Sequence, residues 1–98
     1  MTVEPLRVAI VEDQREIREG LAALIRGTPG FHCTGTFRSA EEALGPLADD
    51  PPQVVLLDIG LPGMSGIEAI PRLKERCPSV AVLLLTVCLL YTSDAADE

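Results

Sequence analysis

The sequence has few aromatic residues, few bases and no long apolar run, and each shortage argues against a class of protein. Its 98 residues include two Phe, one Tyr and no Trp, and 8 Lys and Arg stand against 15 Asp and Glu, a net charge of −7. A nucleic-acid surface built by this chain itself is therefore not expected. The apolar stretch between residues 80 and 91 is shorter than the ~20 residues of a membrane-spanning helix, so no membrane partner is expected.

Cysteine is also scarce. Cys33, Cys77 and Cys88 are scattered along the chain and form no C-x-x-C pair. This pattern is typical of reduced thiols in a cytoplasmic protein, because disulfide frameworks belong mainly to secreted proteins. The first residues contain no basic segment followed by an apolar one, so no signal peptide is predicted. We therefore expect one small cytoplasmic domain, and the 47% apolar content is enough for a single core.

The most informative stretch is an apolar run that ends in an acid. Residues 54–57 are all apolar, and Asp58 and a loop rich in Pro and Gly follow them. A continuous apolar run bounded by turn residues predicts a strand that is buried on both faces. Asp58 then lies at the carboxyl end of a central strand, which is where open α/β sheets bind their ligands.

A second apolar run, residues 6–11, also ends in acids, Glu12 and Asp13. If the two strands are parallel neighbours, these carboxylates and that of Asp58 converge at one edge of the sheet. Like charges at such distances raise one another's pKa and destabilise the fold unless a cation joins them. An oxygen-only ligand set suits Mg²⁺, which keeps several waters and favours phosphate-bearing ligands. The sequence therefore predicts a site for Mg²⁺ and a phosphoryl group.

Helix signals follow each of the first three predicted strands. Three pairs combine a capping residue with a Glu three positions later, and they are Asp13 with Glu16, Ser39 with Glu42, and Ser65 with Glu68. Each helix also has an apolar stripe that is expected to face the core. The stripes are Ile17, Leu21, Leu24 and Ile25; Ala40, Ala43, Leu44 and Leu47; and Ile67, Ile70 and Leu73.

Two further strands complete the predicted order. Residues 31–37 alternate between apolar and polar, which predicts a half-exposed edge strand. Residues 81–86 form another apolar run, and Thr86 is at its carboxyl end. The order is then β-α-β-α-β-α-β, which is typical of α/β proteins with a doubly wound parallel sheet, right-handed crossovers and helices on both faces.

Four motifs in this order resemble the receiver domain of two-component response regulators, which has a flavodoxin-like fold. They are the Glu12-Asp13 pair, Asp58 after its strand, Leu61–Gly66 (LPGMSG), and Thr86. The resemblance covers residues 6–87 and is strongest to the subfamily whose receiver precedes a helix-turn-helix output domain. Ser65 stands where the family usually has Asp, and either residue caps a helix.

The resemblance implies a role for each of these residues. Asp58 would accept a phosphoryl group from a sensor histidine kinase, and Thr86 would be the switch hydroxyl that turns toward it. Asp13, Asp58 and the backbone carbonyl of Gly60 would bind Mg²⁺ directly, and Glu12 would act through a water. The chain would then be a regulatory module rather than an enzyme, and DNA would be contacted only through an output domain that this chain lacks.

The end of the sequence departs from the family pattern. The family's fifth strand, which ends in a lysine, and its last helices are missing after Thr86. Residues 88–98 instead resemble one reading frame of a transposase adapter used in short-read library preparation. We therefore expect an incomplete, truncated receiver domain at residues 1–87 and a non-native tail at 88–98, with a divergent start to a fourth helix as the alternative. The sequence predicts no oligomeric state.

Other functions are weighed against the phosphoacceptor. A phosphohydrolase of the haloacid dehalogenase kind needs a second Asp two residues after the nucleophile, and Gly60 occupies that position. A phosphorylation-independent interaction module, or a fragment without activity, is the remaining alternative. Asp13 as a plain helix cap and Thr86 as a plain strand end are the corresponding alternatives for single residues.

Overall fold

Four short segments, three apolar and one alternating, form one parallel sheet in the computed structural model, which describes residues 4–85. The strands are β1 (Leu6–Val11), β2 (Phe31–Phe37), β3 (Val54–Asp58) and β4 (Ala81–Leu85). Their order across the sheet is β2-β1-β3-β4, and each neighbouring pair is parallel. The predicted alternation of strands and helices is confirmed for this part of the chain, and so is the edge position of β2.

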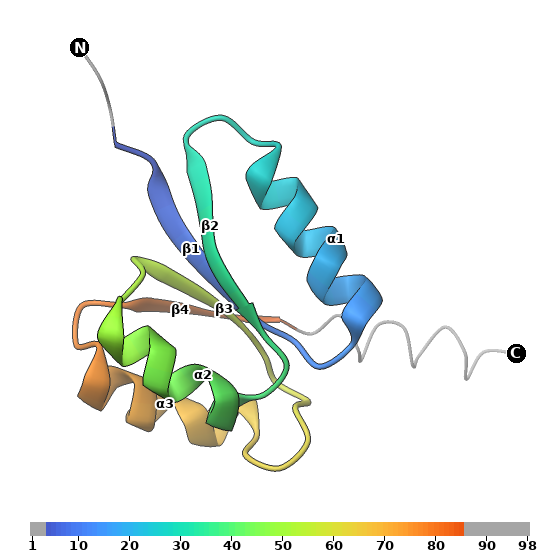
Figure 1. Ribbon diagram of the computed structural model, residues 1–98. Coiled ribbons are helices and arrows are strands. Elements are labelled where there is room, and N and C mark those ends of the chain that lie inside the picture. Colours follow the sequence, from blue (N-terminus) through green and yellow to red (C-terminus); the bar gives the residue numbers. More distant parts are fainter. Residues whose placement is uncertain (1–3, 86–98) are drawn as a thin grey trace, which may run out of the picture.

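Helices lie on both faces of the sheet (Figure 1). On one face, α1 (Arg15–Arg26) packs against β1 and β2. On the other face, α2 (Ala40–Asp49) and α3 (Gly66–Arg76) pack side by side. β1 and β3 are buried most completely because they lie in the middle of the sheet. No helix in the described range is long and apolar enough to cross a membrane.

The main core lies between the sheet and the pair α2 and α3. Alternate residues of β1 and β3 point into it, because side chains alternate across a strand. All four residues of the predicted α2 stripe are buried there, which confirms that stripe. The principal members of this core are Ala9, Val11, Ala40, Ala43, Leu44, Leu47, Val55, Leu57, Ala69 and Leu73.

The start of α1 differs from the prediction. The N-cap residue is Gln14, and its side chain makes no capping hydrogen bond, so the expected capping role of Asp13 is wrong. The predicted stripe also places Leu24 in the core, yet Leu24 is 67% exposed, whereas Ala22 is buried. Two residues along a helix correspond to a turn of about 200°. Because Ala22 faces the sheet, Leu24 must point away from it.

The starts of α2 and α3 differ in how fully their caps are made. Ser65 and Glu68 form a complete capping box at α3, as predicted. Ser39 caps α2 by accepting from the backbone N–H of Glu42 at 3.0 Å. The Glu42 carboxylate accepts from the backbone N–H of Arg38 instead of from Ser39, so the second predicted box is only half formed.

The buried stripe of α3 is rotated from the predicted one. Gly66, Ala69 and Leu73 are buried, whereas Ile67 is 55% exposed. The rotation follows from Gly66, which packs directly against the end of β3. A Cβ added at Gly66 would lie 2.4 Å from the carbonyl oxygen of Asp58, so only glycine allows this approach. Ile67 is one residue further around the helix and turns toward the surface.

Candidate functional site: an acidic cluster at the sheet edge

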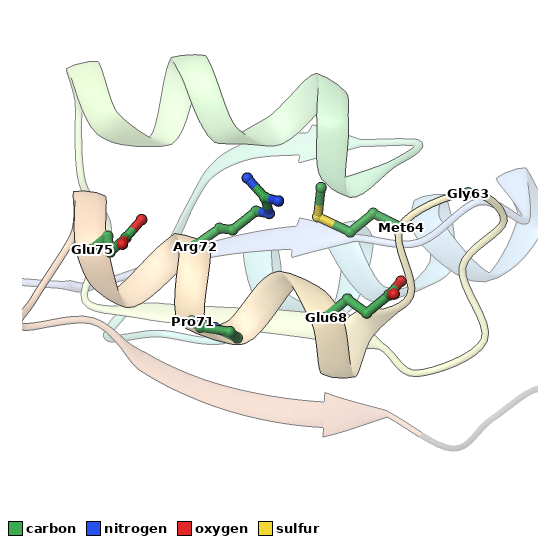
Figure 2. Close-up of a pocket in the computed structure, with 6 residues that line it drawn as sticks. All are labelled: Gly63, Met64, Glu68, Pro71, Arg72 and Glu75. Carbon is green, nitrogen blue, oxygen red and sulfur yellow. The ribbon is translucent and has the colours of Figure 1, made fainter.

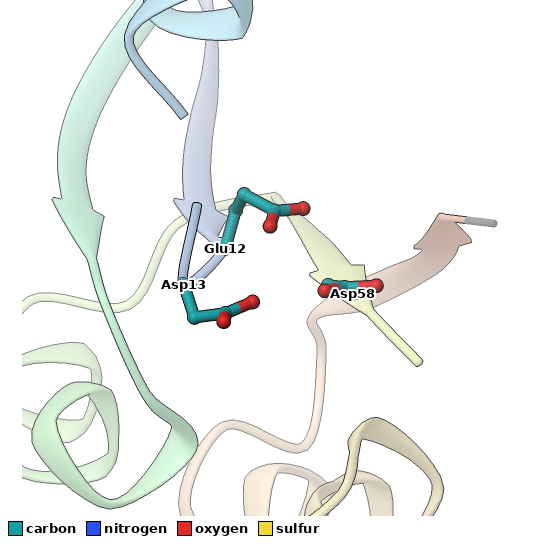
Figure 3. A group of neighbouring side chains, drawn as sticks. All are labelled: Glu12, Asp13 and Asp58. Carbon is teal, nitrogen blue, oxygen red and sulfur yellow. The ribbon is translucent and has the colours of Figure 1, made fainter. Parts of the chain in front are cut away.

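The acidic cluster lies where the chain reverses its direction across the sheet. From β1 the chain crosses to β2 on one side and then returns to β3 on the other. Such a reversal leaves a crevice at the carboxyl ends of the two central strands. Glu12 and Asp13 directly follow β1, and Asp58 is the last residue of β3. One carboxylate oxygen from each of the three lies within 4.8 Å of the others (Figure 3).

Two of these acids are almost completely shielded from solvent. Glu12 is 0% exposed and Asp58 is 1% exposed. Burial raises the pKa of Glu12 to about 7, because a charged carboxylate loses its hydration inside the protein. The charges of Asp58 and Asp13 raise this pKa further, and a hydrogen bond from the backbone N–H of Gln14 opposes the rise.

Two oxygens of the cluster have no hydrogen-bond partner among the described residues. These two oxygens are Glu12 Oε1 and Asp13 Oδ1, and both are buried. Leaving a buried acceptor unsatisfied costs about 1–3 kcal/mol, and more for a charged group. A cation bound to these oxygens would remove this cost. The oxygen-only donor set also suits a hard divalent ion, so the residues present fit Mg²⁺.

The turn after β3 is built around Asp58. The backbone N–H of Gly60 donates to Asp58 Oδ1 at 3.1 Å, and that of Gly66 donates to the carbonyl of Ile59 at 3.2 Å. The backbone N–H of Ile59 donates to the carbonyl of Leu85 at the end of β4. These contacts hold the predicted ligand residue Gly60 two positions after the acid and beside its carboxylate.

Arg18 takes part in the site although the sequence did not point to it. Its Nη1 donates to the carbonyl of Glu12 at 3.0 Å and to that of Asp13 at 3.3 Å. The guanidinium therefore holds the backbone of both acids in place through these two hydrogen bonds. No sequence pattern signals this contact, because the acceptors are backbone carbonyls that every residue has.

A separate hollow lies along the outer side of α3 (Figure 2). It is lined by the loop before α3 and by one stripe of the helix, namely Gly63, Met64, Glu68, Pro71, Arg72 and Glu75. None of the three clustered acids lines it. The hollow and the acidic cluster are therefore distinct features, and only the cluster has converging groups with buried, unsatisfied oxygens.

Some predicted features lie outside the described residues. Thr86 is one of them, so its role as the switch hydroxyl stays a prediction. The predicted division into a domain at residues 1–87 and a tail at 88–98 also stays a prediction.

Comparison with known proteins gives consistent matches to one family. The family model of the response regulator receiver domain matches residues 8–93. Response regulator GacA of Pseudomonas viridiflava is 34% identical over 83 residues, which cover 85% of this chain and 39% of GacA. DNA-binding transcriptional regulator NtrC of Salmonella typhimurium is 38% identical over 79 residues, covering 81% of this chain and 16% of NtrC.

A solved structure gives the same result. The response regulator domain of Thermotoga maritima CheB superposes with a TM-score of 0.77 at 27% identity, over 83% of this chain and 60% of that chain. The fold and the acidic cluster thus define a flavodoxin-like α/β protein with three clustered carboxylates at the point where its strand order reverses. The chain belongs to the family of response regulator receiver domains, as its motifs predicted. Members of this family are regulatory modules of two-component systems.

Proposed function

We propose that Asp58 accepts a phosphoryl group from the phosphohistidine of a sensor histidine kinase. The observation that carries this proposal is the convergence of three carboxylates at the switch point, with one oxygen of each within 4.8 Å of the others. Asp58 is the member that ends a central strand and begins the turn to α3. A change at its carboxylate therefore acts directly on the position of that turn.

In phosphoryl transfer, the main task of the protein is to position the reacting groups. A carboxylate oxygen of Asp58 forms a bond to phosphorus while the phosphorus–nitrogen bond of the phosphohistidine breaks. The electron pair of the broken bond returns to the imidazole nitrogen. Charge spreads over the phosphoryl oxygens as this happens, so catalysis depends on alignment and on neutralising that charge. The buried, preorganised cluster supplies the alignment.

Mg²⁺ is the cofactor that we propose for this cluster. Asp13, Asp58 and the backbone carbonyl of Gly60 would hold it directly, and Glu12 would act through a water. The ion supplies positive charge opposite the phosphoryl oxygens. The unsatisfied oxygens of Glu12 and Asp13 support this assignment, since both are buried acceptors without a described partner. We further propose that Thr86 provides the switch hydroxyl.

The relatives support a proposal about the partners. GacA is a response regulator and NtrC is a DNA-binding transcriptional regulator, and this chain spans 39% and 16% of their lengths. We propose that phosphorylation of a cytoplasmic parent protein switches transcription, with DNA contacted through a different domain. The acid that a haloacid-dehalogenase hydrolase requires is absent, because Gly60 has no side chain.

Labelling with a small phosphodonor tests the acceptor. We expect the 98-residue protein to take up phosphoryl groups from acetyl phosphate in the presence of Mg²⁺, and the label to be released by hydroxylamine as an acyl phosphate is. Asp58→Asn should reduce the label to background, because an amide oxygen is too weak a nucleophile. Asp49→Asn, at an exposed acid of α2, is the matched control and should label like the wild type. Equal labelling of the Asp58 variant would refute the assignment.

A further inference from the structure

Glu41 joins α2 to the loop that follows the proposed acceptor. It lies in the first turn of α2, and its Oε2 accepts a hydrogen bond from the backbone N–H of Met64 at 3.0 Å. The two residues are 23 positions apart in the sequence. Figure 1 shows the beginning of α2 next to the yellow loop between β3 and α3. Through Glu41, α2 thus contacts the middle of the loop that joins β3 to α3.

Gly63 gives a second, independent sign that the loop is shaped around this carboxylate. Its φ of 72° lies in the left-handed region, which favours glycine. A Cβ added at Gly63 would lie 2.8 Å from Glu41 Oε2. The loop backbone therefore passes directly over the carboxylate, and a side chain at this position would displace it.

The remaining contacts hold the two ends of the loop. At its start, the backbone N–H of Ile59 donates a hydrogen bond to the carbonyl of Leu85 in β4, and the backbone N–H of Gly60 donates one to the Asp58 carboxylate. At its end, Ser65 and Glu68 form the capping box of α3. Between these ends, the contact with Glu41 ties the middle of the loop to a different element.

We propose that Glu41 is a positioning residue for the acceptor site. By holding Met64, it restricts the loop that carries Gly60 and so keeps the backbone of Gly60 aligned with Asp58. The proposal rests on the proposed function, in which the carbonyl of Gly60 and the carboxylate of Asp58 bind Mg²⁺. Residues that hydrogen-bond a metal ligand directly typically change metal affinity by about 10–100-fold when they are removed. We expect an effect no larger than the lower end of this range, because Glu41 is exposed and acts through Met64 rather than on a ligand directly.

The test compares two substitutions of Glu41. Glu41→Ala removes both the charge and the acceptor, whereas Glu41→Gln removes the charge and keeps an acceptor oxygen. In the 98-residue protein, amide NMR measures hydrogen exchange at Met64 and the dissociation constant for Mg²⁺. We expect Glu41→Ala to speed exchange at Met64 and to weaken Mg²⁺ binding by up to about tenfold. Glu41→Gln should stay close to the wild type in both.

Asp49→Ala is the charge control, because it removes an exposed acid from the other end of the same helix. It should leave exchange at Met64 and Mg²⁺ binding near the wild-type values. If Glu41→Gln and Glu41→Ala weakened Mg²⁺ binding equally, charge alone would account for the effect and the positioning role would be refuted. Wild-type behaviour of Glu41→Ala would refute it as well.

Gly63→Ala approaches the same contact from the loop side. Its methyl group would push the Glu41 carboxylate away, so exchange at Met64 should again become faster. Added to Glu41→Ala, the same substitution should speed this exchange by less than it does alone, because the contact is already gone and only the backbone strain at the φ of 72° remains. Additive effects would overturn the proposal. Failure of the proposed function would appear differently, as absence of saturable Mg²⁺ binding in the wild type.

Discussion

At the scale of single residues, the acidic site combines two opposing requirements. Glu12 must be buried to lie beside Asp58, yet burial raises its pKa to about 7 and disfavours its charged form. The same burial leaves Glu12 Oε1 without a described partner. The site by itself is therefore unfavourable for the stability of the fold, and a bound cation would remove this cost.

The pKa of Glu12 predicts how stability depends on pH in the metal-free protein. The pKa is about 7 in the folded state and 4.5 in the reference state, so between these values the folded protein binds more protons. The free energy of unfolding should then fall as the pH rises from 4.5 to 7. Urea unfolding across this range, with a chelator present, measures the effect.

Glu12→Gln tests whether this residue is the cause. The variant cannot ionise at this position, so most of the decline in stability between pH 4.5 and 7 should disappear. Glu16→Gln, at an exposed acid on α1, is the control and should keep the wild-type decline. If both variants declined like the wild type, burial of Glu12 would not be the source.

The residues of the site could be predicted from the sequence to a large extent. Strand ends mark the carboxyl edge of a parallel sheet, so the pattern of apolar runs is enough to place Glu12, Asp13 and Asp58 together. Arg18 and Glu41 could not be predicted, because each binds the backbone of another segment. Backbone groups carry no residue identity, so such contacts leave no pattern in the sequence.

At the scale of elements, the strands were easier to predict than the helix faces. Apolar runs ending in turn residues marked β1 and β3 correctly. The α2 stripe was also correct, whereas Leu24 of α1 and Ile67 of α3 are exposed. Periodicity gives the spacing of a face but not its rotation about the helix axis. The rotation depends on small residues, Ala22 and Gly66, at which the helices approach the sheet closely.

Gly66 and Gly20 provide a matched pair for this idea. Gly66→Ala should destabilise the protein by about 1–3 kcal/mol, because its methyl group would meet the backbone of Asp58. Gly20 lies inside α1, and a Cβ there would meet nothing within 4 Å apart from its own chain neighbours. Gly20→Ala should therefore stabilise the protein by about 0.5–1 kcal/mol, since alanine favours helix. Thermal or urea unfolding compares the two, and similar effects of both would contradict the packing argument.

At the scale of the whole molecule, the sheet order explains why the site lies where it does. The order β2-β1-β3-β4 places the reversal between β1 and β3, and acids lie at the carboxyl end of both strands, Glu12 directly after β1 and Asp58 as the last residue of β3. The parallel register then puts the ends of these strands side by side. Helices on both faces bury the strands, so the carboxyl edge is where polar groups gather. The fold thus concentrates negative charge at one edge, where a cation and a phosphoryl group could bind.

The most direct test of this account is an amide NMR spectrum of the 98-residue protein with Mg²⁺, before and after addition of beryllofluoride. Beryllofluoride stands in for a phosphoryl group on an aspartate. The account predicts saturable shifts with Mg²⁺ at Asp13, Asp58 and Gly60, further shifts at these residues with beryllofluoride, and loss of the second set in Asp58→Asn. A well-dispersed spectrum that responds to neither addition would contradict it.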